Sequence, residues 1–399
     1  MRLLPLLLFF ALGASVTYGS PEVAKDARPN ILFCLADDWS WPHAGAYGDP
    51  VVKTPAFDRL AREGLLFEHA YVSSPSCTPS RNALLTGQQF YRLGTGANLY
   101  GTLDSRHPNF MFLLREAGYS IGHWRKAWGP GKFQDGGYRE HPCGPESSFA
   151  VFMQQRDKTK PFCFWFGTSD PHRSYEEGSG RKKGMDIDRV PVPGFYPKVD
   201  TIRSDIADYY FEVERWNHDV AQALDLLEKA GELDNTIVVM TGDNGMPFPR
   251  CKGNLYDSGI RNYMPARWPA GTPDHRNAYK ENAWLGDCDN GPTKYYLWAN
   301  RDLDDEHRRC HDLAFDKRPA EELYVLADDP DQLRNVAGNP EYADVKADLA
   351  ARLTNYLQKT GDPRETGKPV KFDAYSYCGG LPTWPGDKAI RKYMSPPTP

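Results

Sequence analysis

Short runs rich in apolar residues recur along the first part of the chain, separated by longer segments with helical periodicity. Several of these runs are apolar almost throughout, which is typical of strands buried on both faces of a parallel sheet. The pattern predicts strands over residues 30–35, 65–72, 120–124, 162–167 and 236–241.

The segments between these runs carry helix start and stop signals. Thr54 and Pro55 suit the cap and the first turn of a helix that Gly64 ends. Strands that alternate with helices predict an α/β fold, in which a mostly parallel sheet is covered by helices on both faces. Further helices are predicted from Pro79 to Leu85, with Cys77 at or just before its start, from Pro108 to Glu116 and from Ile202 to Lys229.

Polar residues directly follow three of the predicted strands. Because ligands bind beyond the carboxyl ends of the strands in such sheets, we expect these residues to face one crevice. They are Asp37 and Asp38, then Asp170 and His172, then Asp243 and Asn244.

Four of these residues, Asp37, Asp38, Asp243 and Asn244, form an all-oxygen set with a net charge of minus three. Three carboxylates in one crevice repel one another unless a cation lies between them. Hard oxygen ligands suit calcium or magnesium rather than zinc. Taken alone, each pair is better explained as a helix cap or a turn. Together at strand ends, they predict a metal site.

Cys77 lies where a helix is predicted to begin, in the sequence Cys77-Thr78-Pro79-Ser80-Arg81. A cysteine in isolation would be a buried thiol or half of a disulfide. Here the free N–H groups of a helix N-terminus favour anions, and Arg81 adds a fixed positive charge. The segment therefore predicts a site for an oxyanion.

The N-terminus has the layout of a secretory signal. Met1-Arg2 precede an apolar run from Leu3 to Val16, and small residues follow at Gly19 and Ser20. The run is short for a membrane span, so we favour its removal; a retained anchor is the alternative. No other segment of the sequence is apolar enough to cross a membrane.

A formal net charge of −5 gives no reason to expect nucleic acid or an anionic membrane as a partner. The chain has 8 cysteines, which in an exported protein invite disulfides. Cys34 and Cys163, however, lie in predicted buried strands, where a thiol packs as a small hydrophobe. The loop cysteines that could pair, in a connectivity the spacing does not give, are Cys143, Cys251, Cys288, Cys310 and Cys378.

The sequence from Cys77 to Arg81, followed by Leu85-Thr86-Gly87, resembles the signature of the sulfatase family, in the alkaline-phosphatase superfamily. The resemblance runs in order from about residue 28 to residue 259, and residues 318–331 are similar to the family's C-terminal signature. The variants at 170–173 and 243–249 are most similar to the heparan N-sulfatase (sulfamidase) branch and its bacterial relatives.

This resemblance implies a nucleophile made from Cys77. In the family a dedicated enzyme oxidises the motif cysteine to formylglycine, whose hydrated aldehyde attacks sulfur and then expels sulfate; a serine would be left as a stable sulfate ester. The resemblance also implies one calcium ion, which neutralises charge on the nucleophile and the transferred group. Its ligands would be Asp37, Asp38, Cys77, Asp243 and Asn244.

Four more residues match catalytic positions of the family. Arg81 would hold the formylglycine diol and the sulfate, and Lys126 would bind both of them. His172 would protonate the leaving group, and Lys252 would be the last cation on the sulfate. On the residues alone, the lysines could be ordinary surface residues and His172 could cap a turn; the context of Cys77 reverses that preference.

The chain departs from the family pattern at two places. Many sulfatases carry a histidine that helps to deprotonate the diol two residues after the site lysine, where this chain has Trp128. After Gly259 the sequence already resembles a later region of the family, so a piece the size of a small subdomain is predicted to be missing. Missing strands would leave an unpaired sheet edge and exposed apolar surface. We expect a signal peptide over 1–20, a catalytic domain over 21–259 and an incomplete C-terminal subdomain over 260–399.

The favoured interpretation is an exported sulfatase, periplasmic, secreted or in a lysosome-like compartment, that acts on sulfated carbohydrates such as glycosaminoglycans. N-sulfoglucosamine-type substrates are weakly favoured over O-sulfate esters, and the maturation partner would be a formylglycine-generating enzyme. One alternative is a phosphatase or phosphonate hydrolase of the same superfamily. Another is a catalytically inactive protein that binds sulfated sugars, which Trp128 and the missing segment would favour.

Overall fold

Four strands form one sheet in the computed structural model, which describes residues 28–261, 287–367, 372, 375 and 382–395. All of their pairings are parallel. The predicted α/β fold with a parallel sheet is therefore confirmed. The strands are β1 (Asn30–Ala36), β2 (Ser120–Trp124), β3 (Phe162–Gly167) and β4 (Thr236–Gly242), in the spatial order β2-β3-β1-β4.

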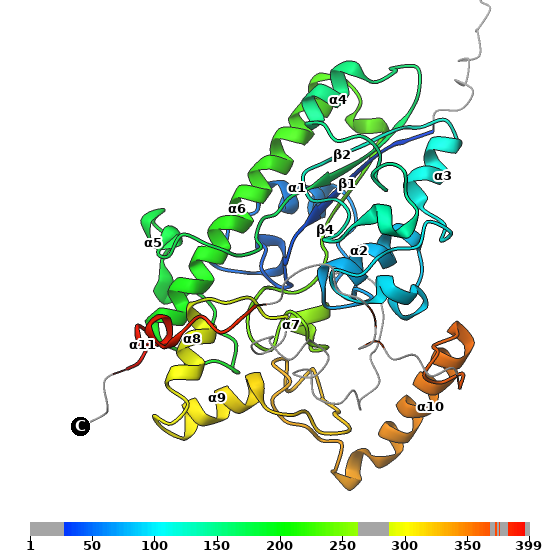
Figure 1. Cartoon of the computed structure of the whole chain (residues 1–399). Helices are drawn as coiled ribbons and strands as arrows, with labels where there is room; N and C mark the ends of the chain where they lie inside the picture. The colour runs from blue at the N-terminus through cyan, green and yellow to red at the C-terminus, as the bar shows by residue number, and fades with distance from the viewer. Residues whose placement is uncertain (1–27, 262–286, 368–371, 373–374, 376–381, 396–399) are drawn as a thin grey trace, which may run out of the picture.

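Helices cover both faces of this sheet, as Figure 1 shows. Successive side chains of a strand point to opposite faces. On β3, Phe164 and Phe166 pack in one apolar cluster with residues of α6 (Asp200–Lys229), whereas Trp165 packs in a second cluster with residues of α2 (Cys77–Thr86) and α3 (Phe110–Glu116). A strand buried on both faces explains its continuous apolar sequence.

The strand predicted over residues 65–72 is not formed. Leu65 and Phe67 are 83% and 59% exposed. A strand needs a neighbour whose backbone groups pair with its own along its length, and no described strand lies beside this segment. The backbone contact at its end joins the N–H of Val72 to the carbonyl of Ile260 at 2.9 Å.

β4 lies at an end of the described sheet and pairs there with β1. Two of its side chains, Ile237 and Val239, are 50% and 38% exposed, although strands of parallel sheets are usually covered on both faces. This edge has the exposed apolar character that missing strands were expected to leave. That a segment is missing after Gly259 stays a prediction.

The predicted helices form with small shifts of their ends. α1 spans Pro55–Glu63 and is followed by Gly64. Thr54 precedes α1, but its hydroxyl accepts from the N–H of Gly45 and donates to Asp58 instead of capping the helix. The remaining α-helices are α4 (Phe149–Gln155), α5 (Ser179–Lys182), α7 (Asp257–Ile260), α8 (Pro292–Ala299), α9 (Asp305–Phe315), α10 (Ala343–Thr360) and α11 (Asp387–Arg391).

The chain after residue 286 packs back onto the rest of the molecule. α8 lies against α6, and α10, at the margin of the view in Figure 1, is anchored by the buried Leu357. The domain boundary expected between residues 259 and 260 falls inside α7 and stays a prediction.

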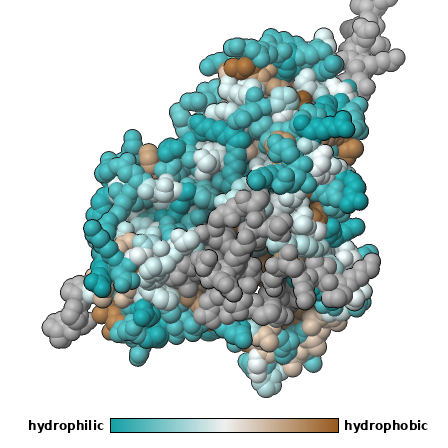
Figure 2. All heavy atoms as spheres, in the orientation of Figure 1, coloured by the Kyte–Doolittle hydropathy of each residue, from teal (hydrophilic) through white to brown (hydrophobic). Residues whose placement is uncertain are grey.

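The surface seen in Figure 2 is mostly hydrophilic, with apolar residues in small separate spots. Among the described residues, no helix is both long and apolar enough to cross a membrane. The signal predicted over residues 1–20 lies outside the described part of the chain.

Cys34 and Cys163 are buried free thiols, as their strands predicted. Cys378, one of the loop cysteines, lies outside the described residues. The other loop cysteines are buried and unpaired in the structure: Cys143, Cys251, Cys288 and Cys310.

Candidate active site

The carboxyl ends of β1 and β4 bring four oxygen-bearing side chains together. Asp37 and Asp38 follow β1, and Asp243 and Asn244 follow its neighbour β4. Each of the four residues is at most 1% exposed. The N–H of Asp38 donates to Oδ1 of Asp243 at 2.9 Å, and Nδ2 of Asn244 donates to Oδ1 of Asp38 at 2.7 Å. The predicted crevice therefore contains these residues.

The donor set at these strand ends fits a hard cation. Carboxylate oxygens of Asp37, Asp38 and Asp243 lie within 4.8 Å of one another and of Sγ of Cys77. Oδ1 of Asn244 is buried and has no hydrogen-bond partner among the described residues. Such an acceptor costs free energy unless something binds it. Oxygens of this kind are the ligands that calcium prefers.

The buried carboxylates of Asp37 and Asp243 have different proton affinities. Burial opposes ionisation of Asp37, but attraction to Lys126 and His172 holds its pKa well below the usual range. Burial raises the pKa of Asp243 to about 6, although Arg81 opposes the rise. Without a cation, Asp243 therefore takes up a proton more readily than Asp37.

Cys77 is the first residue of α2. Its Sγ lies 3.4 Å from Oδ1 of Asp37 and 3.8 Å from Oδ1 of Asp38. Burial and the negative charge of Asp37 raise the pKa of the Cys77 thiol well above its usual value. Because the thiolate is the nucleophilic form of cysteine, an unmodified Cys77 is a poor nucleophile in this position.

Arg81 lies one turn further along α2 and is fully buried. Its Nε donates to Oδ2 of Asp243 at 2.7 Å, and its Nη2 lies 3.4 Å from Oδ1 of Asp37. Nη1 donates to the carbonyls of Lys126 and Ala127 at 2.9 Å each. One guanidinium thus fixes the ends of β1 and β4 and the loop after β2 relative to Cys77.

Three further side chains predicted as catalytic converge on the same carboxylates. Nζ of Lys126 lies 2.5 Å from Oδ2 of Asp37. Nζ of Lys252 lies 3.0 Å from Oδ2 of Asp38, and Nε2 of His172 lies 3.8 Å from the same oxygen. The structure thus brings together the side chains that the sequence predicted as metal ligands or as catalytic.

A model of the sulfatase family matches residues 29–283 of the chain. The chain belongs to the sulfatase family. It is 33% identical over 292 residues to human N-sulphoglucosamine sulphohydrolase, an alignment that covers 61% of this chain and 57% of the human protein. An ulvan-active sulfatase from Formosa agariphila is 25% identical over 418 residues, with 85% of this chain and 82% of that protein covered. The chain thus spans little more than half the length of the human relative.

The fold of the chain is also that of a solved phosphonate monoester hydrolase from Agrobacterium radiobacter. The two structures have a TM-score of 0.57 at 16% sequence identity, over 84% of this chain and 96% of the other. At that identity the likeness concerns the fold alone.

Trp128 stands where many members of the family have a histidine. Its Nε1 donates to Oδ1 of Asn82 on α2 at 2.7 Å, and the residue is 7% exposed. An indole nitrogen is a donor only, so Trp128 cannot take a proton from a nucleophile. It packs α2 against the loop that carries Lys126 instead.

Two carboxylates near the site were not predicted from the sequence. Oδ2 of Asp287 accepts from the hydroxyl of Ser76 at 2.6 Å, and Oδ2 of Asp289 lies 3.1 Å from Nζ of Lys252. Burial raises the pKa of Asp287 to about 6, against the attraction of Lys252. In the sequence both residues belong to a polar turn before a Pro-initiated helix, a common pattern; the fold alone places that turn beside Lys252.

Asp170 was expected to face the crevice, and this prediction was wrong for its side chain. Its Oδ2 lies 3.0 Å from Nη2 of Arg215 on α6. Its backbone carbonyl accepts from the N–H of Asp37 at 3.0 Å. Asp170 therefore anchors the loop that carries His172, and the side chain of His172 is the one from this loop that reaches the carboxylates.

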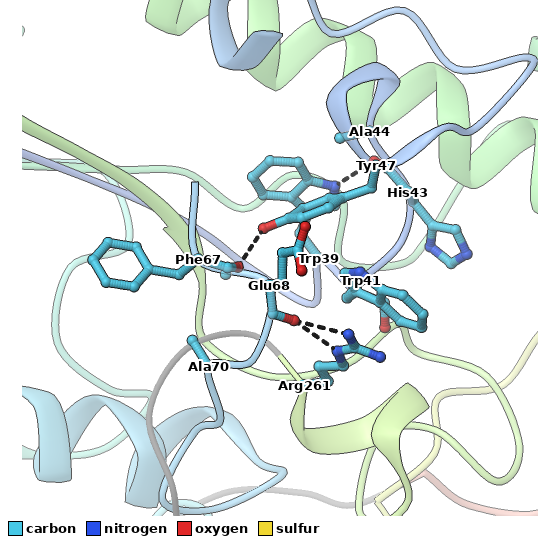
Figure 3. Close-up of a pocket in the computed structure, with 11 residues that line it drawn as sticks. Trp39, Trp41, His43, Ala44, Tyr47, Phe67, Glu68, Ala70 and Arg261 are labelled. Carbon is cyan, nitrogen blue, oxygen red and sulfur yellow. Dashed lines mark hydrogen bonds between the residues drawn. The ribbon is translucent and has the colours of Figure 1, made fainter. Parts of the chain in front are cut away.

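A separate small pocket, shown in Figure 3, lies between the loop after β1 and the segment 65–72. Its lining includes the aromatic residues Trp39, Trp41, Tyr47 and Phe67. Arg261 stacks over the ring of Trp41 at 3.5 Å and donates to the carbonyl of Glu68. Since no predicted site residue lines this pocket, it is a packing feature apart from the active site.

Proposed function

We propose that the protein is a sulfatase that hydrolyses sulfated carbohydrates, using a formylglycine made from Cys77 and one bound calcium ion. The observation that carries the proposal is the convergence of buried carboxylates and of Arg81, Lys126 and His172 around Cys77 in a member of this family. Cations arranged in advance around a reacting centre stabilise the charge of a sulfuryl-transfer transition state.

The chemistry of Cys77 supports its conversion. The raised pKa keeps the thiol protonated and unreactive. A hydrated aldehyde at this position would supply one hydroxyl that attacks sulfur and a second that allows sulfate to leave. Because Cys77 is 1% exposed, a formylglycine-generating enzyme would have to reach it before the chain folds around it.

Calcium, bound by Asp37, Asp38, Asp243, Asn244 and the oxygen at position 77, would neutralise negative charge on the nucleophile and the sulfate. The cationic side chains of the chain itself bind and position the reacting groups. Lys126 and Lys252 bind the sulfate oxygens, and Arg81 positions the nucleophile. His172 protonates the leaving group through Nε2, because its Nδ1 contacts the carbonyl of Arg173 at 2.5 Å.

Among sulfated sugars, we favour N-sulfoglucosamine-type substrates. The name of the human relative and the motifs at 170–173 and 243–249 support this choice. The signal-like N-terminus supports export, with residues 21–259 as the catalytic domain and 260–399 as a C-terminal subdomain.

The test is an assay of the anion released. The chain is co-expressed with a formylglycine-generating enzyme, and sulfate and phosphate are measured by ion chromatography with glucosamine N-sulfate, glucosamine 6-O-sulfate and a phosphate monoester as substrates. We expect sulfate release, fastest from the N-sulfate, and none from a folded Cys77→Ala variant. Faster phosphate release would establish the phosphatase alternative, and sugar binding without turnover would establish an inactive binding protein.

A further inference from the structure

Few of the described side chains form the outward face of the site. The side chains of Lys126, His172 and Asp289 are 21%, 29% and 21% exposed. The side chains beneath them are at most 2% exposed: Asp37, Asp38, Arg81, Asp243 and Lys252. Of these charged side chains, the three are therefore the ones that a molecule in solution can contact. Two of them carry N–H donors that suit a sulfate, and Asp289 is the carboxylate among them.

Among the described residues, the contacts of the Asp289 carboxylate are made through one of its oxygens. Oδ2 lies 3.1 Å from Nζ of Lys252 and 3.7 Å from Nε2 of His172. Oδ1 has no hydrogen-bond partner among the described residues. Burial opposes ionisation of Asp289, but attraction to Lys252 and His172 lowers its pKa below the usual value. The group is thus an anion with one acceptor oxygen left for a ligand.

A free carboxylate beside a sulfate-binding pocket distinguishes between substituents of a sugar. It accepts hydrogen bonds from hydroxyl or amino groups, and such charge-assisted bonds are stronger than neutral ones. It repels a second sulfate, because like charges at short range raise the free energy of the complex. A site built around a substrate donor also rejects analogues that lack the donor, since its own polar group is then left unpaired.

We propose that Asp289 determines specificity: its Oδ1 accepts a hydrogen bond from a hydroxyl or amino group next to the cleaved sulfate, and its charge rejects a neighbouring sulfate. The inference rests on the proposed sulfatase function, because it describes a substrate of the same site. It concerns recognition of the sugar and leaves the attack on sulfur to the groups around Cys77.

The experiment compares three sulfated compounds on the converted enzyme. They are glucosamine N-sulfate, the same sugar with an added 3-O-sulfate, and 4-nitrophenyl sulfate, which has no neighbouring donor. The variants are Asp289→Ala, which removes the acceptor, and Asp289→Asn, which keeps the shape and a partner for Lys252 but removes the charge. Asp344→Asn, at an exposed position on α10, is the control for the loss of one negative charge.

We expect Asp289→Ala to lower kcat/KM for glucosamine N-sulfate by about ten- to a hundredfold, the loss that one unpaired hydrogen bond predicts. Turnover of 4-nitrophenyl sulfate should change much less. Asp289→Asn should raise the rate on the disulfated sugar relative to the monosulfated one. Equal losses on all three compounds, or no loss, would overturn the inference and leave the sulfatase proposal standing. A fully converted wild type that cleaves none of them would overturn both.

Discussion

At the scale of single residues, Asp243 joins several parts of the site. Its carboxylate accepts from the N–H of Asp38 and pairs with Arg81, and its carbonyl accepts from the hydroxyl of Ser80 at 2.5 Å. Burial raises its pKa to about 6. A bound cation would displace the proton, because metal ligands must be deprotonated.

We therefore predict that calcium stabilises the protein. A ligand that binds the native state alone stabilises it by about 2.7 kcal/mol at a hundredfold excess over Kd. The melting temperature should rise with calcium and fall with a chelator, and Asp243→Ala should remove the rise. Differential scanning calorimetry with and without calcium measures this without any assay of activity.

The rise in melting temperature that calcium causes should depend on pH in a definite direction. The raised pKa of Asp243 means that the calcium-free native state holds an extra proton below about pH 6. Protons then compete with calcium, so the increment should be full above pH 7 and shrink as the pH falls through about 6. An increment that is absent at every pH, or that chelators do not remove, contradicts the metal site.

The residues of the candidate site were predictable from the sequence where polar residues directly follow strands. Asp37, Asp38, Asp243 and Asn244 follow two strands that proved to be neighbours, so their meeting follows from the topology of a parallel sheet. Asp289 was not predictable in this way. It precedes a helix, and its approach to Lys252 depends on how α8 packs against α6.

At the scale of elements, α2 and its neighbouring loop show why Trp128 suits its position. The indole N–H donates to the buried side chain of Asn82 at 2.7 Å. We predict that Trp128→Phe lowers the free energy of unfolding by about 1–3 kcal/mol, the cost of leaving a buried acceptor unpaired. Sulfate turnover should persist, since the indole takes no proton.

Urea denaturation and a sulfate assay of the same preparation would check this. Trp384→Phe, at a position 44% exposed, is the matched control and should change stability by less than about 0.5 kcal/mol. If the Trp128→Phe variant loses turnover while its stability is unchanged, Trp128 has a catalytic role that its hydrogen bond to Asn82 does not explain.

The strand predicted over residues 65–72 failed for a reason that lies outside its own sequence. The apolar content of Leu65 and Phe67 suits a strand, but strand formation depends on a partner. β1, β2, β3 and β4 formed as predicted because each has a paired neighbour. Periodicity therefore identified the strands, whereas pairing decided which of them the fold retains.

At the scale of the whole molecule, β4 ends the described sheet with Ile237 and Val239 exposed. The alignment with the Formosa agariphila relative spans 418 positions, more than the 399 residues of this chain, so part of that relative has no counterpart here. Neither observation locates the gap, so a missing segment after Gly259 stays a prediction.

We predict that inserting a relative's segment after Gly259 raises both stability and turnover. Covering apolar surface contributes about 25 cal/mol per Å², and the support for the site would be more rigid. A Gly-Ser insertion of equal length is the control. Melting temperatures and turnover on the same sulfated sugar give the comparison; equal values for the unaltered chain and the segment insertion would show that the short architecture is self-sufficient.

In the proposed mechanism, position 77 carries the nucleophile for sulfuryl transfer. The most direct measurement is the intact mass and peptide map of a Cys77→Ser variant after incubation with glucosamine N-sulfate. A hydroxyl there can attack sulfur but cannot expel sulfate, so we predict a stable sulfate ester on the peptide that contains position 77, and none when Cys77→Ala is treated alike. If the converted wild type releases sulfate while the Cys77→Ser variant acquires no ester, the nucleophile lies elsewhere and the account is wrong.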